Sequence, residues 1–330
     1  MTNSQPPLRP QVAVIIPTLN EEQHIDHLLT QMVKTPVHTL RKIIVADGGS
    51  TDKTVDIVKI RSATDDRIVL LDNPHKIQAA GINLAVASLP PEINVIVRID
   101  AHAGYPDNYI GLLTETLEKT GAASVVVRLE TSGGNCLQNA IAAVSNGLIG
   151  TGGSAHRMGG QSRFVDHGHH AAFKREIFEA AGGYDPSFRA NEDAELDYRI
   201  RQSGGLIWLD TAISVIYFPR KTLTSLAKQY WRYGIGRAQN FLKHGERLHL
   251  RQLLPPLMTI MILFGALAGW LFAPLLIFPV GYLAIVVAVA LILTVRNRQP
   301  CLLWLIFALP AMHIAWGSGF IAKLVRKRSE

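Results

Sequence analysis

An aspartate and a histidine, two positions apart, follow an apolar run in the first third of the chain. Residues 98–106 read RIDAHAGYP, and Asp100 and His102 come just after the apolar residues 95–97. Because residues i and i+2 of an extended chain point to the same side, both side chains can meet one ligand. Mg²⁺ and Mn²⁺ prefer oxygen ligands, and Mn²⁺ accepts imidazole more readily. The pair is therefore a candidate metal site, and the alternative is a turn cap beside a solvated histidine.

A second acidic group lies in the segment NEDAELDYRIR, residues 191–201. Glu192 and Asp193 begin a predicted helix whose buried stripe contains Leu196 and Ile200. A carboxylate that is held within hydrogen-bond reach of an acceptor hydroxyl can act as a general base. We expect Asp193 to be that base and Glu192 to be a second candidate, although an ordinary helix N-terminus also favours acidic residues. The remaining acids of the segment, at positions 195 and 197, are predicted to be surface charges.

The elements that position these residues alternate between short apolar runs and helical patterns. This alternation predicts an α/β fold with a mostly parallel, Rossmann-like sheet. The expected strands are 12–16, 42–46, 68–71, 95–99 and 124–127, and the expected helices are 21–33, 51–60, 77–87 and 108–119. Ligands bind beyond the carboxyl ends of the strands in such sheets. The segments PTLNEE, DGGSTDKT and DAHAGYP all fall at that edge.

The C-terminal third has the composition of a membrane region. The stretch 253–295 contains no charged residue and no histidine. As a helix of about 1.5 Å per residue it would run roughly 65 Å, about two crossings of a ~30 Å hydrocarbon layer. A third apolar run, 301–322, is broken by Pro310, His313 and Gly317. Basic residues favour the cytoplasmic side, which places the front domain there, but a third full crossing would put the basic tail outside, against that rule.

These patterns predict five segments. They are a flexible N-terminus (1–10), a catalytic domain (11–220), a basic amphipathic interface segment (221–252), a membrane region of two to three spans (253–322) and a basic tail (323–330). The net charge is +7, and much of the excess lies in the interface segment and the tail. The two cysteines have no disulfide-framework or zinc-finger spacing, which fits a reducing compartment. The N-terminus has no secretory signal.

Four motifs in order carry a family resemblance: VAVIIPTLNEEQHI, IIVADGGSTDKTVDI, IVRIDAH and NEDAELDYRIR. Over roughly residues 11–240 the chain resembles the inverting family 2 glycosyltransferases of the GT-A fold, and within them the ExoA-type succinoglycan glucosyltransferases. The resemblance implies a GT-A domain followed by C-terminal transmembrane helices. It also implies a UDP-sugar donor and a Mg²⁺ or Mn²⁺ cofactor.

The resemblance also implies roles for single residues. Pro17, Thr18 and Glu22 would contact the nucleoside, and Asp47 would read the uracil. Asp100 and His102 stand at the metal motif, which in the family usually has two aspartates, and this difference leaves the preferred metal open. Asp193 matches the catalytic base.

The segment QYWRY, residues 229–233, resembles the Gln-x-x-Arg-Trp motif of sugar-polymer synthases. Gln229 and Arg232 would bind the nucleotide-sugar, since an arginine fork suits a diphosphate, and Tyr233 would stack on a sugar of the acceptor. The same segment is also typical of an amphipathic helix on anionic lipid. The segment HGHH at 167–170 looks like a zinc site but has no fitting further ligand, so we expect a loop near the acceptor, with His170 contacting it.

The expected function is transfer of a hexose, most simply glucose from UDP-glucose, to a polyprenyl-diphosphate-linked saccharide in exopolysaccharide biosynthesis. The expected location is the inner (plasma) membrane, multi-pass, with the catalytic domain cytoplasmic. Expected partners are the donor, the lipid-linked acceptor, membrane lipids and other exopolysaccharide assembly enzymes, and no nucleic acid. Two alternatives stay open: a polyprenyl-phosphate glycosyltransferase or processive synthase, and a catalytically inactive membrane scaffold that keeps a nucleotide-binding fold.

Overall fold

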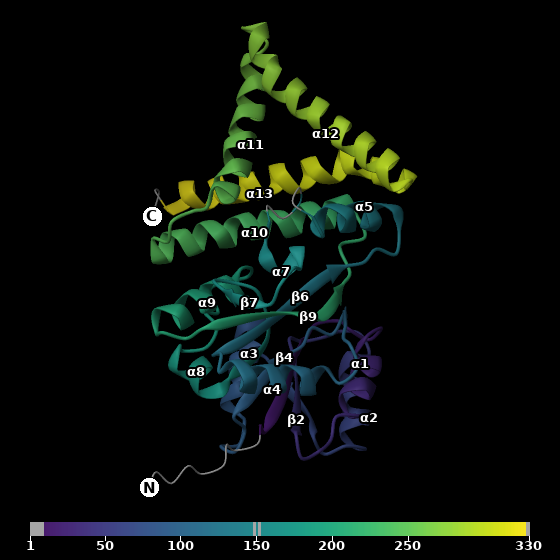
Figure 1. The fold of residues 1–330 in the computed structure, drawn as a ribbon, viewed down its shortest axis with the longest axis vertical. Coiled ribbons are helices and arrows are strands. Elements are labelled where there is room, and N and C mark those ends of the chain that lie inside the picture. The colour runs from purple at the N-terminus through teal and green to yellow at the C-terminus, as the bar shows by residue number, and fades with distance from the viewer. Residues whose placement is uncertain (1–9, 148–149, 151–152, 328–330) are drawn as a thin grey trace. The chain divides into compact units, whose positions relative to one another are not determined.

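The computed structural model describes residues 10–147, 150 and 153–327 and divides into two compact units (Figure 1). Residues 1–129 and 159–216 form the first, which we call the sheet unit. Residues 130–158 and 217–330 form the second, which we call the helical unit. The chain therefore leaves the sheet unit once, between strands, before it leaves for good near residue 217. Each unit is described by itself.

The sheet unit begins with the predicted alternation of strands and helices. Strands β1 (Val12–Thr18), β2 (Leu40–Asp47), β3 (Ile68–Asp72) and β4 (Val95–Arg98) run parallel in the order β3-β2-β1-β4. The connecting helices are α1 (Ile25–Met32), α2 (Thr54–Ser62) and α3 (Gln78–Ala87). Strands β1, β2 and β4 are rich in β-branched residues and largely buried, as expected for a parallel sheet covered by helices, whereas the edge strand β3 is partly exposed. The mostly parallel α/β fold is confirmed.

Antiparallel strands extend the sheet beyond β4. Strand β8 (His169–Lys174) lies antiparallel between β4 and β6 (Ser124–Thr131). The order continues through β9 (Ile207–Tyr217) to β5 (Ala103–Gly104), and β7 (Arg163–Val165) pairs with β9. Three further helices belong to this unit: α4 (Tyr109–Thr120), α8 (Arg175–Ala180) and α9 (Glu192–Gln202). The insertion of β8 brings a late part of the chain next to the end of β4.

Strand register aligns the loops that carry the motifs. Thr18 at the end of β1 pairs with Asp47 at the end of β2, which pairs with Asp72 at the end of β3. Because the parallel strands end in register, their carboxyl ends form one edge. One apolar core anchors that edge, with β1, β2 and β4 packed against α1 and α4.

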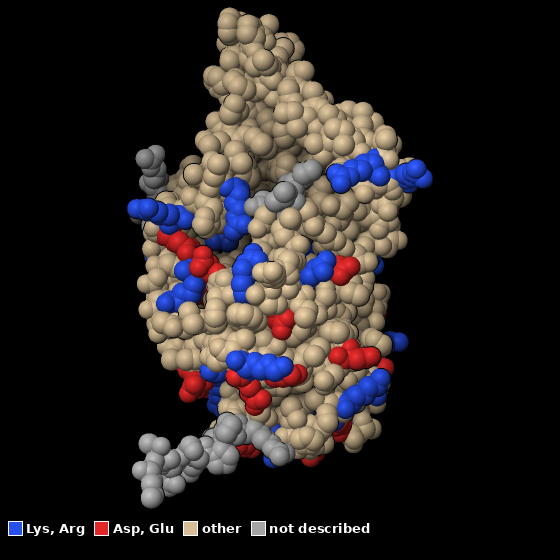
Figure 2. Space-filling view, in the orientation of Figure 1, with Lys and Arg blue, Asp and Glu red and all other residues tan. Residues whose placement is uncertain are grey.

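Within its described residues, the helical unit contains three helices that are long and apolar enough to cross a membrane. They are α11 (Leu250–Ala268), α12 (Ile277–Asn297) and α13 (Leu305–Lys327), preceded by α10 (Leu223–His244). The unit also contains the short helices α5 (Cys136–Ser145), α7 (Ala155–Met158), η1 (Ala273–Leu276) and η2 (Pro300–Trp304). Large apolar side chains of α11, α12 and their connection are open to the surroundings; Trp270 is 92% exposed and Leu271 is 93% exposed. In the face that Figure 2 shows, the end formed by α11 and α12 carries no acidic or basic side chain.

A disulfide joins Cys136, the first residue of α5, to Cys301 in η2. The sequence predicted no disulfide framework, and this single bond departs from that expectation. The two cysteines are 165 residues apart. Their spacing therefore carries no local signal, and only the packing of α5 against η2 brings them together.

Candidate active site

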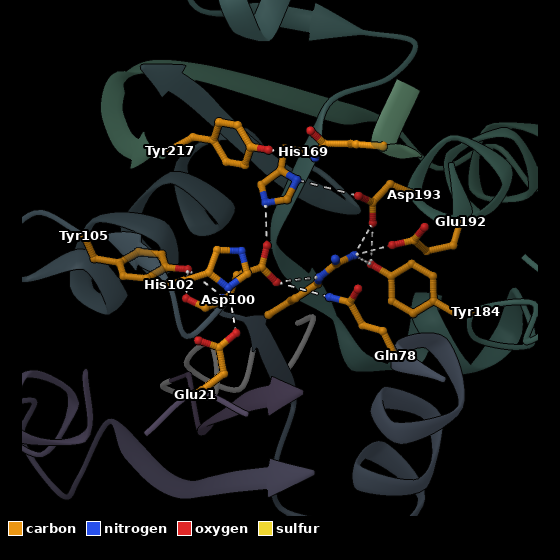
Figure 3. A network of polar contacts seen from close by, with 12 residues as sticks. Glu21, Gln78, Asp100, His102, Tyr105, His169, Tyr184, Glu192, Asp193 and Tyr217 are labelled. Atoms are coloured by element: carbon orange, nitrogen blue, oxygen red, sulfur yellow. Dashed lines mark hydrogen bonds and ion pairs between the residues drawn. The ribbon is translucent and has the colours of Figure 1, made fainter. Parts of the chain in front are cut away.

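Asp100 and Asp193 lie in one network of polar contacts (Figure 3), and Arg98 contacts both carboxylates. Arg98 Nη1 donates a hydrogen bond to Asp193 Oδ1 over 2.5 Å, and Arg98 Nε is 3.5 Å from Asp100 Oδ1. Asp100 lies two residues after the end of β4, whereas Asp193 lies in the first turn of α9. Asn191, just before that helix, has φ +62°, a left-handed conformation that asparagine tolerates better than most residues. This turn starts α9 at Glu192 and brings its first acids beside Arg98.

Tyr184 and Glu192 complete the arrangement around Arg98. The Tyr184 hydroxyl donates to Asp193 Oδ1 over 2.9 Å, and the Arg98 guanidinium lies 5.6 Å from the centre of the Tyr184 ring. Glu192 Oε1 is 3.4 Å from Arg98 Nη1. The Arg98 side chain is only 5% exposed. One buried guanidinium therefore contacts three carboxylates, and Arg98 and Tyr184 both donate to Oδ1 of Asp193.

Burial and neighbouring charge act in opposite directions on these groups. Burial alone would lower the pKa of Arg98, but Asp193 and the other carboxylates raise it well above its usual range. Burial would raise the pKa of Asp100, but Arg98 and the imidazoles of His169 and His102 outweigh it, so the net pKa is lowered. Burial and the negative charge of Asp193 both raise the pKa of Glu192. Asp100 is thus an ionised oxygen donor at neutral pH.

His169, the first residue of β8, faces both aspartates. Its Nε2 is 3.6 Å from Asp100 Oδ2 and its Nδ1 is 3.6 Å from Asp193 Oδ2 (Figure 3). The antiparallel pairing of β8 with β4 explains this position, because it brings His169 past the end of β4. The imidazole thus forms a second link, besides Arg98, between the candidate metal ligand and the candidate base.

His102 contacts an acidic residue of the first loop, and its role as a metal ligand stays a prediction. Its Nδ1 is 2.8 Å from Glu21 Oε1, and its side chain is 42% exposed. Among the described residues, no three His, Cys, Asp or Glu side chains already converge as a metal cage. The donor groups at this point still suit a divalent cation chemically. They are the ionised carboxylate of Asp100 and the neighbouring imidazoles of His102 and His169. The residues present therefore fit Mn²⁺ in donor type.

The residues predicted to bind the nucleoside lie along the ends of β1 and β2. Asp47 is buried; its Oδ1 accepts from the Ser50 hydroxyl (2.5 Å) and from Thr18 Oγ1 (3.3 Å), and its Oδ2 accepts from the backbone N–H groups of Gly49 and Ser50. Gly49 has φ +86°, which glycine adopts without strain. Asp47 thus builds the turn after β2. Pro17 precedes Thr18 on β1.

Glu22 closes a related contact between the first two loops. Its Oε2 accepts from the backbone N–H of Lys53, and its own N–H donates to Asp52. The two loops are therefore tied together beside the ends of β1 and β2. A nucleoside role for Glu22 and for Asp47 stays a prediction.

The predicted residues Gln229 and Tyr233 lie together in the helical unit. The Gln229 amide donates to the hydroxyls of Tyr217 (2.8 Å) and Tyr233 (3.0 Å). The Arg157 guanidinium lies 5.0 Å from the centre of the Tyr217 ring. Arg232 is exposed and lines a crevice of about 290 Å³ with Lys228 and Trp231. The amide–tyrosine cluster and Arg232 thus occupy different surroundings on α10.

Two acids that were predicted to be surface charges are fully buried, and that prediction is wrong. Asp197 Oδ2 is 2.7 Å from His167 Nδ1, and Glu195 pairs with Arg199 one turn further along α9. Helical spacing alone cannot show that partners from other segments cover this face. The predicted acceptor contact His170 lies in β8, but its side chain falls outside the described part of the structure.

Arg98, Tyr184 and His169 were missed as site residues by reasoning from the sequence. Arg98 read as the continuation of an apolar strand, although a charged residue in a buried strand was a usable signal because such charges are almost always paired. Tyr184 had no distinguishing signal. His169 stood in a motif that was considered, but its contacts depend on a β8 that no local pattern predicted.

Comparisons with known proteins identify the family of the chain. Residues 13–182 match the protein family described as "Glycosyl transferase family 2". The succinoglycan biosynthesis protein ExoA of Rhizobium meliloti (strain 1021) is 42% identical over 316 residues, which covers 94% of each chain. A Methanococcus voltae dolichyl N-acetyl-alpha-D-glucosaminyl phosphate 3-beta-D-2,3-diacetamido-2,3-dideoxy-beta-D-glucuronosyltransferase is 23% identical over 338 residues, or 96% of this chain and 98% of that one.

A solved structure has the same fold. The mannosyltransferase PcManGT from Pyrobaculum calidifontis, in complex with GDP-Man and Mn²⁺, has a TM-score of 0.59 at 20% identity and covers 97% of this chain and 88% of that one. The GT-A-like sheet domain followed by long apolar C-terminal helices is therefore confirmed. On the family match and the ExoA similarity together, this chain belongs to glycosyl transferase family 2.

Proposed function

We propose that this glycosyltransferase moves glucose from UDP-glucose, with inversion, to a polyprenyl-diphosphate-linked saccharide on the cytoplasmic face of the inner membrane. The observation that carries the proposal is the meeting of Asp100 and Asp193 on Arg98 and His169. Asp100 as a metal ligand and Asp193 as a general base, together in one site, suit displacement of a diphosphate by a hydroxyl. The similarity to a succinoglycan biosynthesis protein supports a role in exopolysaccharide assembly.

The reaction needs one base and one displacement. The acceptor hydroxyl oxygen forms a bond to the anomeric carbon while the bond from that carbon to the diphosphate oxygen breaks. The hydroxyl proton passes to Asp193, and attack from the face opposite the leaving group inverts the anomeric centre. Arg98 and Tyr184 hold Asp193 Oδ1, and we assign proton transfer to Oδ2, which faces His169. Glu192 is the second candidate base and a candidate acceptor contact.

Asp100, with His102 or His169, would hold a divalent cation beside the diphosphate. Such a cation, when bound, neutralises charge that develops on the leaving group. Mn²⁺ in the PcManGT complex is consistent with this assignment. At the ends of β1 and β2, Pro17, Thr18, Glu22 and Asp47 would bind the nucleoside. Gln229 and Arg232 would contact the donor, and Tyr233 and His170 the acceptor.

The lipid-linked acceptor rests on two observations. The helical unit carries three helices that are apolar enough to cross a membrane, and a lipid-linked substrate explains why a transferase would stay there. The name of the Methanococcus voltae relative also gives a dolichyl-linked sugar phosphate as acceptor. Other exopolysaccharide assembly enzymes would supply that acceptor and use the product.

Turnover by the purified full-length protein in detergent tests the proposal. UDP-glucose, UDP-galactose, UDP-N-acetylglucosamine and GDP-mannose would each be supplied with Mg²⁺ or Mn²⁺, beside Asp100→Ala as control. We expect turnover of UDP-glucose that the control lacks, with one sugar added. A ladder of products would indicate a processive synthase, and a protein that neither binds nor turns over any donor would indicate a scaffold.

A further inference from the structure

Helix α13 packs along α10, not along the outer faces of α11 and α12 alone. Leu226 of α10 shares an apolar cluster with Leu305, Leu309 and Met312 of α13. Further along, the two backbones touch: a Cβ on Gly234 would overlap the carbonyl of Trp316. Figure 1 shows the two helices side by side. Because the two helices are packed together, α10 must lie at the same depth in a membrane as α13.

Helix α10 is too highly charged to lie within the hydrocarbon layer of a membrane. It carries Lys228, Arg232, Arg237 and Lys243 within its 22 residues. Lys228 and Arg232 are exposed, and both line the crevice that Ala315, in the middle of α13, also lines. If α13 crossed the bilayer, these two cations would lie beside its centre, where charged side chains are rare and costly.

Helices α11 and α12 have the length and the apolar outer surface of membrane spans. At about 1.5 Å per residue, their 19 and 21 residues are each about 30 Å long, the thickness of a hydrocarbon layer. Their outward side chains are apolar, and both rise away from the α10–α13 pair to meet at the far end (Figure 1). Trp270 at that far end, and Trp231 and Trp304 at the near end, are exposed where interfacial tryptophans occur in membrane proteins.

We propose that α11 and α12 form a hairpin that crosses the bilayer and returns, and that α13 is not a third span. In this arrangement α10 and α13 lie as a pair in the interface on the side from which α11 starts. Their partner there is an anionic phospholipid surface, which the amino and guanidinium groups of Lys228, Arg232, Lys323 and Arg326 suit. Arg296 and Arg298, at the end of α12, come back to the same side. The basic residues that flank the spans then share one side, which removes the conflict that three crossings create.

The inference rests on the membrane attachment proposed above, and full-length fusions test it without needing activity. A green fluorescent protein is placed after Glu330, an alkaline phosphatase is placed there in a second version, and in a third an epitope is inserted next to Trp270. We expect a fluorescent C-terminal fusion, an inactive C-terminal phosphatase and an epitope that antibody reaches on intact spheroplasts.

An active C-terminal phosphatase would overturn the inference, because α13 would then cross. An epitope next to Trp270 that antibody reaches only after permeabilisation would overturn it too, because the hairpin would not cross. Sugar transfer measured on the same membranes is scored separately. Loss of the proposed activity with the expected topology would therefore count against the proposed function and not against this arrangement.

Discussion

In the sheet unit, the carboxylates of Asp100, Glu192 and Asp193 lie within a few ångströms of the Arg98 guanidinium. None of these side chains is more than 21% exposed. In the helical unit the pattern is reversed: Lys228 and Arg232 are exposed, and so are large apolar side chains such as Leu271. Buried charges need partners with good geometry. Exposed apolar surface of this extent needs a partner of another kind, such as lipid.

The difference separates two uses of charge. Around Arg98 the charges fix geometry, because each carboxylate is directed by the same guanidinium. On α10 the basic side chains set how deep the helix lies in the bilayer, because they can contact lipid headgroups but not the hydrocarbon layer. The consequences of a substitution should therefore differ in kind between the two units, even for the same residue type.

Arg98→Met should have the largest effect. Removing the cation leaves three carboxylates without their shared partner, and breaking a buried ion pair costs about 3–5 kcal/mol. Thermal unfolding in detergent should show a markedly lower Tm and loss of transfer. Arg232→Met is the matched control in the other unit and should leave Tm nearly unchanged, since exposed charges contribute little. Equal losses of Tm in both variants would contradict the comparison.

Two substitutions to arginine in the helical unit test the comparison of the two units further. Ile285→Arg puts a charge on the exposed face of α12 near the middle of the proposed span, at a cost of about 2.5–3.5 kcal/mol. Phe307→Arg puts the same charge on an exposed position of α13, where headgroups are in reach. Carbonate extraction of membranes should release much more of the first variant than of the second. The opposite ranking would favour a spanning α13.

His169→Ala should have an intermediate effect confined to the site. Groups that support a metal ligand typically change metal affinity by about 10–100-fold when removed. Mn²⁺ titration followed by electron paramagnetic resonance, with UDP present, should show weaker binding and an unchanged Tm. His38→Ala, at an exposed position, is the control. If His102→Ala weakens Mn²⁺ binding and His169→Ala does not, the Asp-x-His pair alone holds the metal.

Glu192→Gln should have the smallest overall effect, a modest change in Tm, and the sign of this change follows from the raised pKa of Glu192. An acid whose pKa is higher in the folded state favours its protonated form there, so its ionisation destabilises the fold as pH rises above the unfolded value. The neutral amide removes that cost at pH 7 and should raise Tm by about 1–3 °C. Scans at pH 4 should show little difference, because Glu192 is then largely protonated in both states. A lower Tm at pH 7 would contradict the assignment.

The sequence predicted the frame of the site better than its interior. Short apolar runs and helical patterns located β1 to β4 and the helices between them, because strands that are buried on both faces have nearly continuous apolar sequences. Placing Asp100 and Asp193 in one site needed the family resemblance, since no local pattern connects residues so far apart. Arg98 and His169 escaped because their roles come from long-range pairing: Arg98 through α9, and His169 through the insertion of β8 beside β4.

Asp193→Asn tests the central claim most directly. The substitution keeps the size of the side chain and its contacts with Arg98 and Tyr184 in outline, but it removes the group that accepts the proton. We expect transfer from UDP-glucose to be lost while UDP-glucose binding, measured by calorimetry, stays within a few-fold of the unaltered protein. Asp66→Asn, at an exposed position of the same unit, should behave like the unaltered protein. Transfer that survives in Asp193→Asn at a comparable rate would show that this aspartate is not the base.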